Sequence, residues 1–84
     1  MKKTWEVMHA GHSIRVENTW FGGENLFVDG VLQDQQVGIR LSSRLFGKVE
    51  IEANKYEDIK ISIGSIVRMH CQIFVGDRLI YTSM

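Results

Sequence analysis

Three histidines and one cysteine are the residues of this sequence that could hold a metal ion: His9, His12, His70 and Cys71. A structural zinc site needs four ligands, commonly in closely spaced pairs. His9 and His12 flank a predicted hairpin turn, whereas the neighbours His70 and Cys71 point to opposite faces of a predicted strand and cannot bind one metal together. We therefore expect no metal site and interpret His9 and His12 as a surface pair at a turn.

Cys71 is also the candidate for nucleophilic catalysis. In the predicted strand it shares a face with Met69 and Ile73, and apolar surroundings raise the pKa of a thiol and make it inert. The sequence contains no Gly-x-Ser-x-Gly elbow and no glycine-rich phosphate loop. Glu50 and Glu52 alternate with aliphatic residues, as on a solvated sheet face. We expect a protein that is not an enzyme and uses no cofactor.

Two neighbouring aromatic residues, Trp20 and Phe21, precede Gly22-Gly23 in a predicted loop. If exposed, they would form a stacking platform for a carbohydrate, a base or a peptide. If folded back, one of them would close the open end of the fold, and the sequence is compatible with both. Ten Lys and Arg residues balance ten Asp and Glu residues, so no net positive charge attracts nucleic acid. Nucleic acid is therefore a weaker candidate partner than a protein.

The chain has 84 residues, the size of one small domain, and we interpret residues 1–84 as a single domain. A lone cysteine excludes an internal disulfide and indicates a reducing compartment. The basic start is not followed by the apolar run of a signal peptide, and no stretch approaches the roughly 20 apolar residues of a membrane span. We expect a cytoplasmic protein that does not contact a membrane.

Alternation of apolar and polar residues with a period of two is the main structural signal, and it is typical of strands with one buried face. It predicts strands at residues 5–7, 13–18, 25–28, 31–32, 48–53, 58–63, 65–75 and 78–82. Asp29-Gly30 and Gly76-Asp77 are strong hairpin-turn signals. The path from Gln33 to Phe46 is not defined, since residues 37–41 fit either a strand end or a crossing over the sandwich. We predict an all-β antiparallel β-sandwich, or flattened barrel, of about seven to eight short strands joined by hairpins.

The predicted long strand 65–75 has one apolar face and one mixed face. Arg68, His70, Gln72 and Phe74 fall on the mixed face. An aromatic ring among hydrogen-bonding groups suits a protein-contact patch, although an ordinary solvated sheet face has the same pattern. Edge strands are a second candidate surface for binding a partner, because an unpaired edge can add a strand from a peptide or from a second copy of the chain.

Several short segments follow one another in a recognisable order: Trp5-Glu6-Val7, Gly11-His12 leading into residues 14–18, a loop with Gly23, and Phe27-Val28-Asp29-Gly30. Leu45-Phe46-Gly47 and the hairpin of residues 69–80 continue the order more faintly. This order resembles the Fas apoptotic inhibitory molecule family, which has a Trp-x-Phe-type apolar strand where this chain has residues 33–36 followed by residues 39–41. The resemblance implies a non-catalytic β-sandwich that binds proteins without a cofactor, linked in animals to apoptosis and to aggregation-prone clients. No residue here is a signature of the apoptotic role.

The sequence therefore predicts a non-enzymatic protein- or peptide-binding β-sandwich module. The alternative is a small ligand-binding domain, for carbohydrate or nucleic acid, that uses the exposed loop aromatics. The candidate binding residues are Trp20, Phe21, Arg68, His70 and Phe74.

Overall fold

The computed structural model describes residues 2–19, 22–38, 42–65 and 69–83. Within these ranges every regular element is a strand, and there is no helix that could cross a membrane. The strands are β1 (Lys2–His9), β2 (His12–Thr19), β3 (Gly23–Val28), β4 (Val31–Gln36), β5 (Ser42–Glu52), β6 (Lys55–Ser65), β7 (Met69–Val75) and β8 (Arg78–Thr82). The prediction of an all-β antiparallel sandwich is confirmed.

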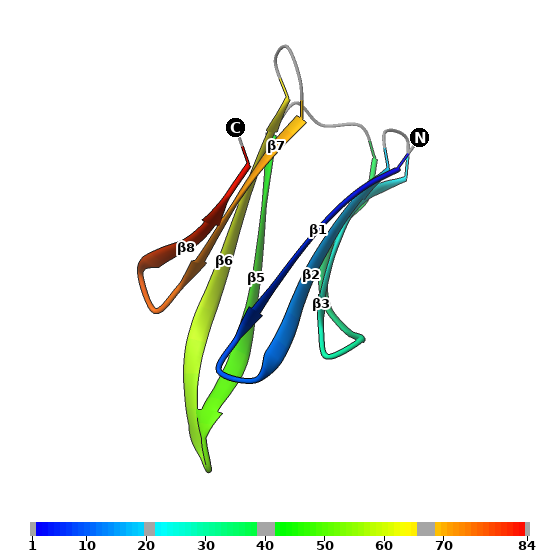
Figure 1. The fold of residues 1–84 in the computed structure, drawn as a ribbon. Coiled ribbons are helices and arrows are strands. Elements are labelled where there is room, and N and C mark those ends of the chain that lie inside the picture. Colours follow the sequence, from blue (N-terminus) through cyan, green and yellow to red (C-terminus); the bar gives the residue numbers. More distant parts are fainter. Residues whose placement is uncertain (1, 20–21, 39–41, 66–68, 84) are drawn as a thin grey trace.

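The strands form two four-stranded sheets, and within each sheet the strands that follow one another in the sequence pair with each other. The first sheet has the order β1-β2-β3-β4 and the second has the order β5-β6-β7-β8. Figure 1 labels β1 to β3 of the first sheet, in blue to cyan, and β5 to β8 of the second, in green to red. Residues 33–36 belong to β4 and residues 42–46 belong to β5. The two alternatives that the sequence left open for residues 37–41 concern residues 39–41, which lie outside the described residues.

Tight turns explain why consecutive strands pair. In Ala10-Gly11, Asp29-Gly30 and Gly76-Asp77 both central residues have φ between 51° and 82°. A type I′ turn requires this left-handed backbone, and its twist matches that of the two strands it joins. The two predicted turn signals, Asp29-Gly30 and Gly76-Asp77, are confirmed.

The prediction of a single strand over residues 65–75 is wrong. Ser65 is the last residue of β6 and pairs with Met69, the first residue of β7, so the two belong to neighbouring antiparallel strands. Ile63 on β6 and Cys71 on β7 both face the same core. Because the apolar residues alternate in the same way on both strands, period alone does not reveal where one strand ends.

The core lies between the two sheets and is built from their inward-facing apolar side chains. Each of these side chains is at most 7% exposed. They are Trp5, Ile14, Val16, Leu26 and Val28 from the first sheet, and Leu45, Val49, Ile59, Ile61, Ile63, Cys71, Ile73 and Val75 from the second. The surfaces left for a partner are therefore the two outer faces and the sheet edges.

Side chains of β4 cover the free edge of β5. The Asp34 carboxylate accepts a hydrogen bond from the backbone N–H of Phe46 at 2.8 Å, and the Gln33 amide oxygen accepts one from that of Lys48 at 2.7 Å. Gly47 makes room for this contact, because a Cβ at that position would collide with the Gln33 amide. These two contacts occupy outward N–H groups in the middle of β5 and obstruct an added strand there.

Candidate functional site

A row of cross-strand neighbours runs across the outer face of the second sheet. The strand register places Phe46 of β5 beside Lys60 of β6, Lys60 beside Phe74 of β7, and Phe74 beside Leu79 of β8. We call these four residues the outer row. Phe46 is 57% exposed and Leu79 is 49% exposed, so the row has an accessible apolar residue at each end.

Inside the outer row, Lys60 covers one of the two aromatic rings. Its Nζ atom lies 4.9 Å from the centroid of the Phe74 ring, within the range of a cation–π contact. Phe74 is half-buried, whereas Phe46 is exposed. Single exposed apolar residues are ordinary on a soluble protein, but neighbours aligned across four strands make a continuous surface.

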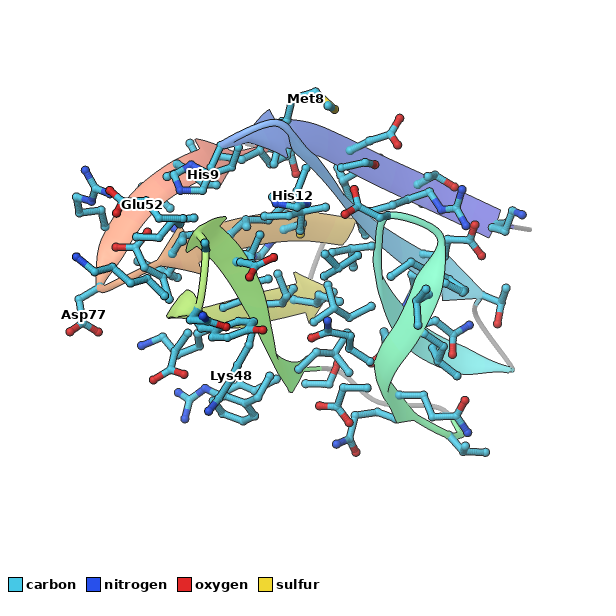
Figure 2. The ribbon with its side chains drawn as sticks, turned by 90° about the horizontal axis from the view of Figure 1, so that it is seen from below. Met8, His9, His12, Lys48, Glu52 and Asp77 are labelled. Carbon is cyan, nitrogen blue, oxygen red and sulfur yellow. The ribbon has the colours of Figure 1, made fainter. Side chains whose placement is uncertain are left out.

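A hollow of about 490 Å³ lies on the same face beside Phe46. Such a volume falls within the range of small ligand pockets, which is about 300–1,000 Å³. Its side walls carry two cationic and two anionic side chains, and Figure 2 labels Lys48 and Asp77 among them. The hollow can therefore receive either an apolar or a polar side chain. Its lining consists of Phe46, Gly47, Lys48, Asp58, Ile59, Lys60 and Asp77.

The outer face of the first sheet is different because its described charges are paired. The Arg15 guanidinium lies 4.6 Å from the centroid of the Phe27 ring, and its Nε lies 3.3 Å from a Glu17 carboxylate oxygen. The Ser13 hydroxyl donates a hydrogen bond to Glu6 at 2.6 Å. The aromatic ring of this face is thus covered and its acidic groups have partners.

Two of the five predicted binding residues lie on the candidate face. Phe74 is part of the outer row, and His70 lies on the same face of β7 with its imidazole against Gly64, where a Cβ would collide with it. Trp20, Phe21 and Arg68 lie outside the described residues.

The sequence did not single out the other three members of the outer row, Phe46, Lys60 and Leu79. Lys60 and Leu79 each fall within a predicted strand, but Phe46 lies in the part of the chain whose path was undefined. The signal that brings the three together is the register between strands, which a single strand pattern does not contain.

His9 and His12 are half-buried and make contacts with carboxylates at the hairpin end of the sandwich (Figure 2). His12 Nδ1 lies 2.6 Å from Asp29 Oδ2, and the other Asp29 oxygen accepts a hydrogen bond from Ser13 N at 2.9 Å. His9 Nε2 lies 3.5 Å from the Glu57 carboxylate of the second sheet. Among the described residues no group of three or more His, Cys, Asp or Glu side chains is arranged to hold a metal ion. These contacts hold turns and sheets together.

The His12–Asp29 pair makes stability depend on pH. The hydrogen bond to Asp29 raises the pKa of His12 above 6.5, and the same bond lowers the pKa of Asp29 below 3.8. The His12 contribution is full below the unfolded-state pKa and is lost as pH rises through the raised pKa, whereas the Asp29 contribution is lost as pH falls through the lowered one. We expect His12→Gln to lower the urea midpoint most near about pH 5 and least above about pH 8. His70→Gln serves as control, and a His12→Gln effect independent of pH would contradict this assignment.

Cys71 is fully buried in the core, as predicted. Burial raises the pKa of its thiol to about 12. Because the thiolate is the reactive form of cysteine, this thiol is a packing group at neutral pH.

A buried carboxylate lies at the opposite end of the sandwich from the two histidines. Glu24 of β3 is 3% exposed and accepts a hydrogen bond from the Asn18 amide of β2 at 3.0 Å. Its second oxygen accepts a hydrogen bond from the Ser43 hydroxyl of β5. Glu24 therefore joins the two sheets through polar contacts, and it was not among the residues that the sequence indicated.

No protein-family model, no curated protein and no solved structure matched this chain. We therefore infer its function from its own surfaces.

Proposed function

We propose that this protein is a non-enzymatic module that binds another protein, or a peptide segment of one, through the outer face of its second sheet. The observation that carries the proposal is the outer row, which ends in the exposed side chains Phe46 and Leu79. A partner segment lying across the row would cover both side chains and place one of its own in the adjacent hollow.

The composition of this face supports a protein partner. Interfaces between proteins favour aromatic residues at their centre and polar groups at the rim. Phe46 and Phe74 supply the aromatic surface, while Lys48, Asp58 and Asp77 surround the hollow and offer donors and acceptors to a peptide backbone. The segment order that resembles the Fas apoptotic inhibitory molecule family supports the same proposal, because that family binds proteins without catalysis.

The remaining expectations from the sequence stay proposals. A cytoplasmic location is supported by the single, buried cysteine. The alternative ligand, a carbohydrate or nucleic acid, depends on Trp20 and Phe21, which lie outside the described residues. Self-association through an edge strand is a second proposed activity, and it is favoured by the outer edges of β1 and β8, with which no described strand pairs.

Replacing Phe46 with serine tests the proposed binding face. Peptides selected from a random display library on the wild-type protein are expected to bind Phe46→Ser at least about tenfold more weakly, because a buried aromatic anchor contributes about 2 kcal/mol or more. Fluorescence anisotropy of a labelled peptide measures the change in Kd. Phe46 is 57% exposed in the free protein, so the stability of the variant is expected to change by no more than about 0.5 kcal/mol.

Met8→Ser is the matched control, since Met8 is 65% exposed but belongs to the first sheet. Met8 also projects away from Lys48 and Asp77 in Figure 2. The proposed face would be overturned if the selected peptides bound Phe46→Ser as tightly as they bind the wild-type protein. It would also be overturned if Phe46→Ser and Met8→Ser weakened their binding equally.

A further inference from the structure

Strand β1 is regular, and none of the described strands pairs with its outer edge. All eight of its residues pair one-to-one with β2, without a register shift. The other free outer strand, β8, has five residues and a register shift opposite Ile73 and Phe74. Short length and bulges protect edge strands from adding another strand. Of the described edges, β1 is the one best suited to strand addition.

The turn geometry shows which backbone groups of β1 are free. The type I′ turn Ala10-Gly11 closes on the pair His9 and His12, which is hydrogen-bonded in such hairpins. Hydrogen-bonded and non-hydrogen-bonded pairs then alternate along β1 and β2. Ser13, the partner of Met8, directs its carbonyl toward β3, where it accepts a hydrogen bond from Asp29 N at 2.9 Å. The backbone groups that point away from β2 are therefore those of Lys2, Thr4, Glu6 and Met8.

Lys2 and Glu6 have contacts within the chain, Lys2 with Glu17 at 3.9 Å and Glu6 with Ser13 at 2.6 Å, and their charges are also complementary to those of a second copy. Lys2 and Glu6 lie two residues before and two residues after Thr4, on the same face of the strand. An antiparallel copy centred on Thr4 places each Lys2 opposite Glu6 of the second copy, and the two Thr4 side chains opposite each other. Opposite charges and paired threonines both stabilise cross-strand neighbours. Since the chain has no net charge, two copies approach without overall repulsion.

Other symmetric registers lose this complementarity. A copy centred on Glu6 would set two carboxylates against each other, and like charges directly opposite are destabilising. A copy centred on Trp5 would set Lys2 opposite Met8. The pairing about Thr4 is therefore the register that the charges favour.

We propose that two copies of this chain pair antiparallel along β1, about Thr4, and join their first sheets into one continuous sheet. The proposal names the edge and the register of the self-association proposed above. It leaves the outer row of the second sheet uncovered, so peptide binding through that row and pairing through β1 succeed or fail independently. Pairing over residues 2–6 makes an interface well below standard size, and we expect a weak dimer whose population rises with concentration.

Cysteine substitutions along one face of β1 test the pairing directly. In a pair centred on Thr4 the two Thr4 Cα atoms lie about 5.5 Å apart, within the range that a disulfide spans. We expect Thr4→Cys to form disulfide-linked dimers at least about tenfold faster than Met8→Cys under the same mild oxidant. If dimers formed only by random collision, Met8→Cys would crosslink as fast as Thr4→Cys or faster, because Met8 is 65% exposed. The native Cys71 is fully buried and does not compete.

Faster crosslinking of Glu6→Cys than of Thr4→Cys, or equal rates at all three positions, would overturn the proposal. Charge exchange supplies a second measurement by sedimentation equilibrium. Lys2→Glu and Glu6→Lys are each expected to raise the dimer dissociation constant about tenfold, and the double variant is expected to restore it. A double variant that associates no better than the single ones would also overturn the proposal. Unchanged tryptophan fluorescence and unchanged peptide binding verify that each variant is folded.

Discussion

Replacing Ile61 with alanine is expected to lower the free energy of unfolding by about 2–5 kcal/mol. Ile61 is fully buried in β6, and its cross-strand neighbours Leu45 and Ile73 are fully buried as well. The substitution removes apolar surface from the core and leaves a cavity that flanking strands fill only in part. A domain of this size is stabilised by a small margin, so the loss is a large fraction of the total.

Urea denaturation followed by tryptophan fluorescence measures the effect. Val37→Ala is the control, because Val37 is 68% exposed and its truncation is expected to change stability by no more than about 0.5 kcal/mol. A loss below about 0.5 kcal/mol for Ile61→Ala would mean that this face of β6 does not line the core.

Replacing Glu24 with alanine is expected to lower the free energy of unfolding by about 2–4 kcal/mol, since hydrogen bonds to charged groups stabilise more than those between neutral groups. The substitution leaves the Asn18 amide and the Ser43 hydroxyl without their described acceptor. The carboxylate no longer has to be desolvated in the variant, and this gain offsets part of the loss.

Glu52→Ala is the matched control for the carboxylate at position 24. The Glu52 side chain is 69% exposed and its ion pair with Lys55, at 3.7 Å, lies on the surface. Exposed pairs of this kind contribute about 0–1 kcal/mol. An equal shift of the thermal unfolding midpoint in Glu24→Ala and Glu52→Ala would show that Glu24 does not hold the sheets together.

The fold class and most of the core were predictable because alternation reports directly on burial. Ile59, Ile61 and Ile63 recur every second residue, and all three face the core. Asp29-Gly30 and Gly76-Asp77 carry the positive φ angles that tight hairpins need. Local chemistry therefore determined these elements, and no knowledge of distant partners was needed.

Strand β4 was not predictable beyond its first residues, because its polar side chains serve a distant strand. Gln33 and Asp34 have the composition of a loop, yet they lie in β4 and bind the backbone of β5. The boundary between β6 and β7 was hidden for a related reason, since both strands present the same alternation to one core.

The candidate face was predictable only in part. The alternation in β7 placed Phe74 and His70 on its outer side, and the structure agrees. The neighbours that make Phe74 part of a row, Phe46 and Leu79, come from strands on both sides of it. Their alignment depends on inter-strand register, which the pattern of one strand does not specify.

Photo-crosslinking in cells tests the proposed contact face most directly. A photoreactive phenylalanine derivative is placed at position 46 in one variant and at position 8 in another, since both side chains are exposed but lie on different sheets. The proposed function predicts that irradiation links one defined partner to position 46 and that Phe74→Ser, introduced into the same variant, abolishes the link. A defined partner that is linked to position 8, with no partner linked to position 46, would contradict the proposed face.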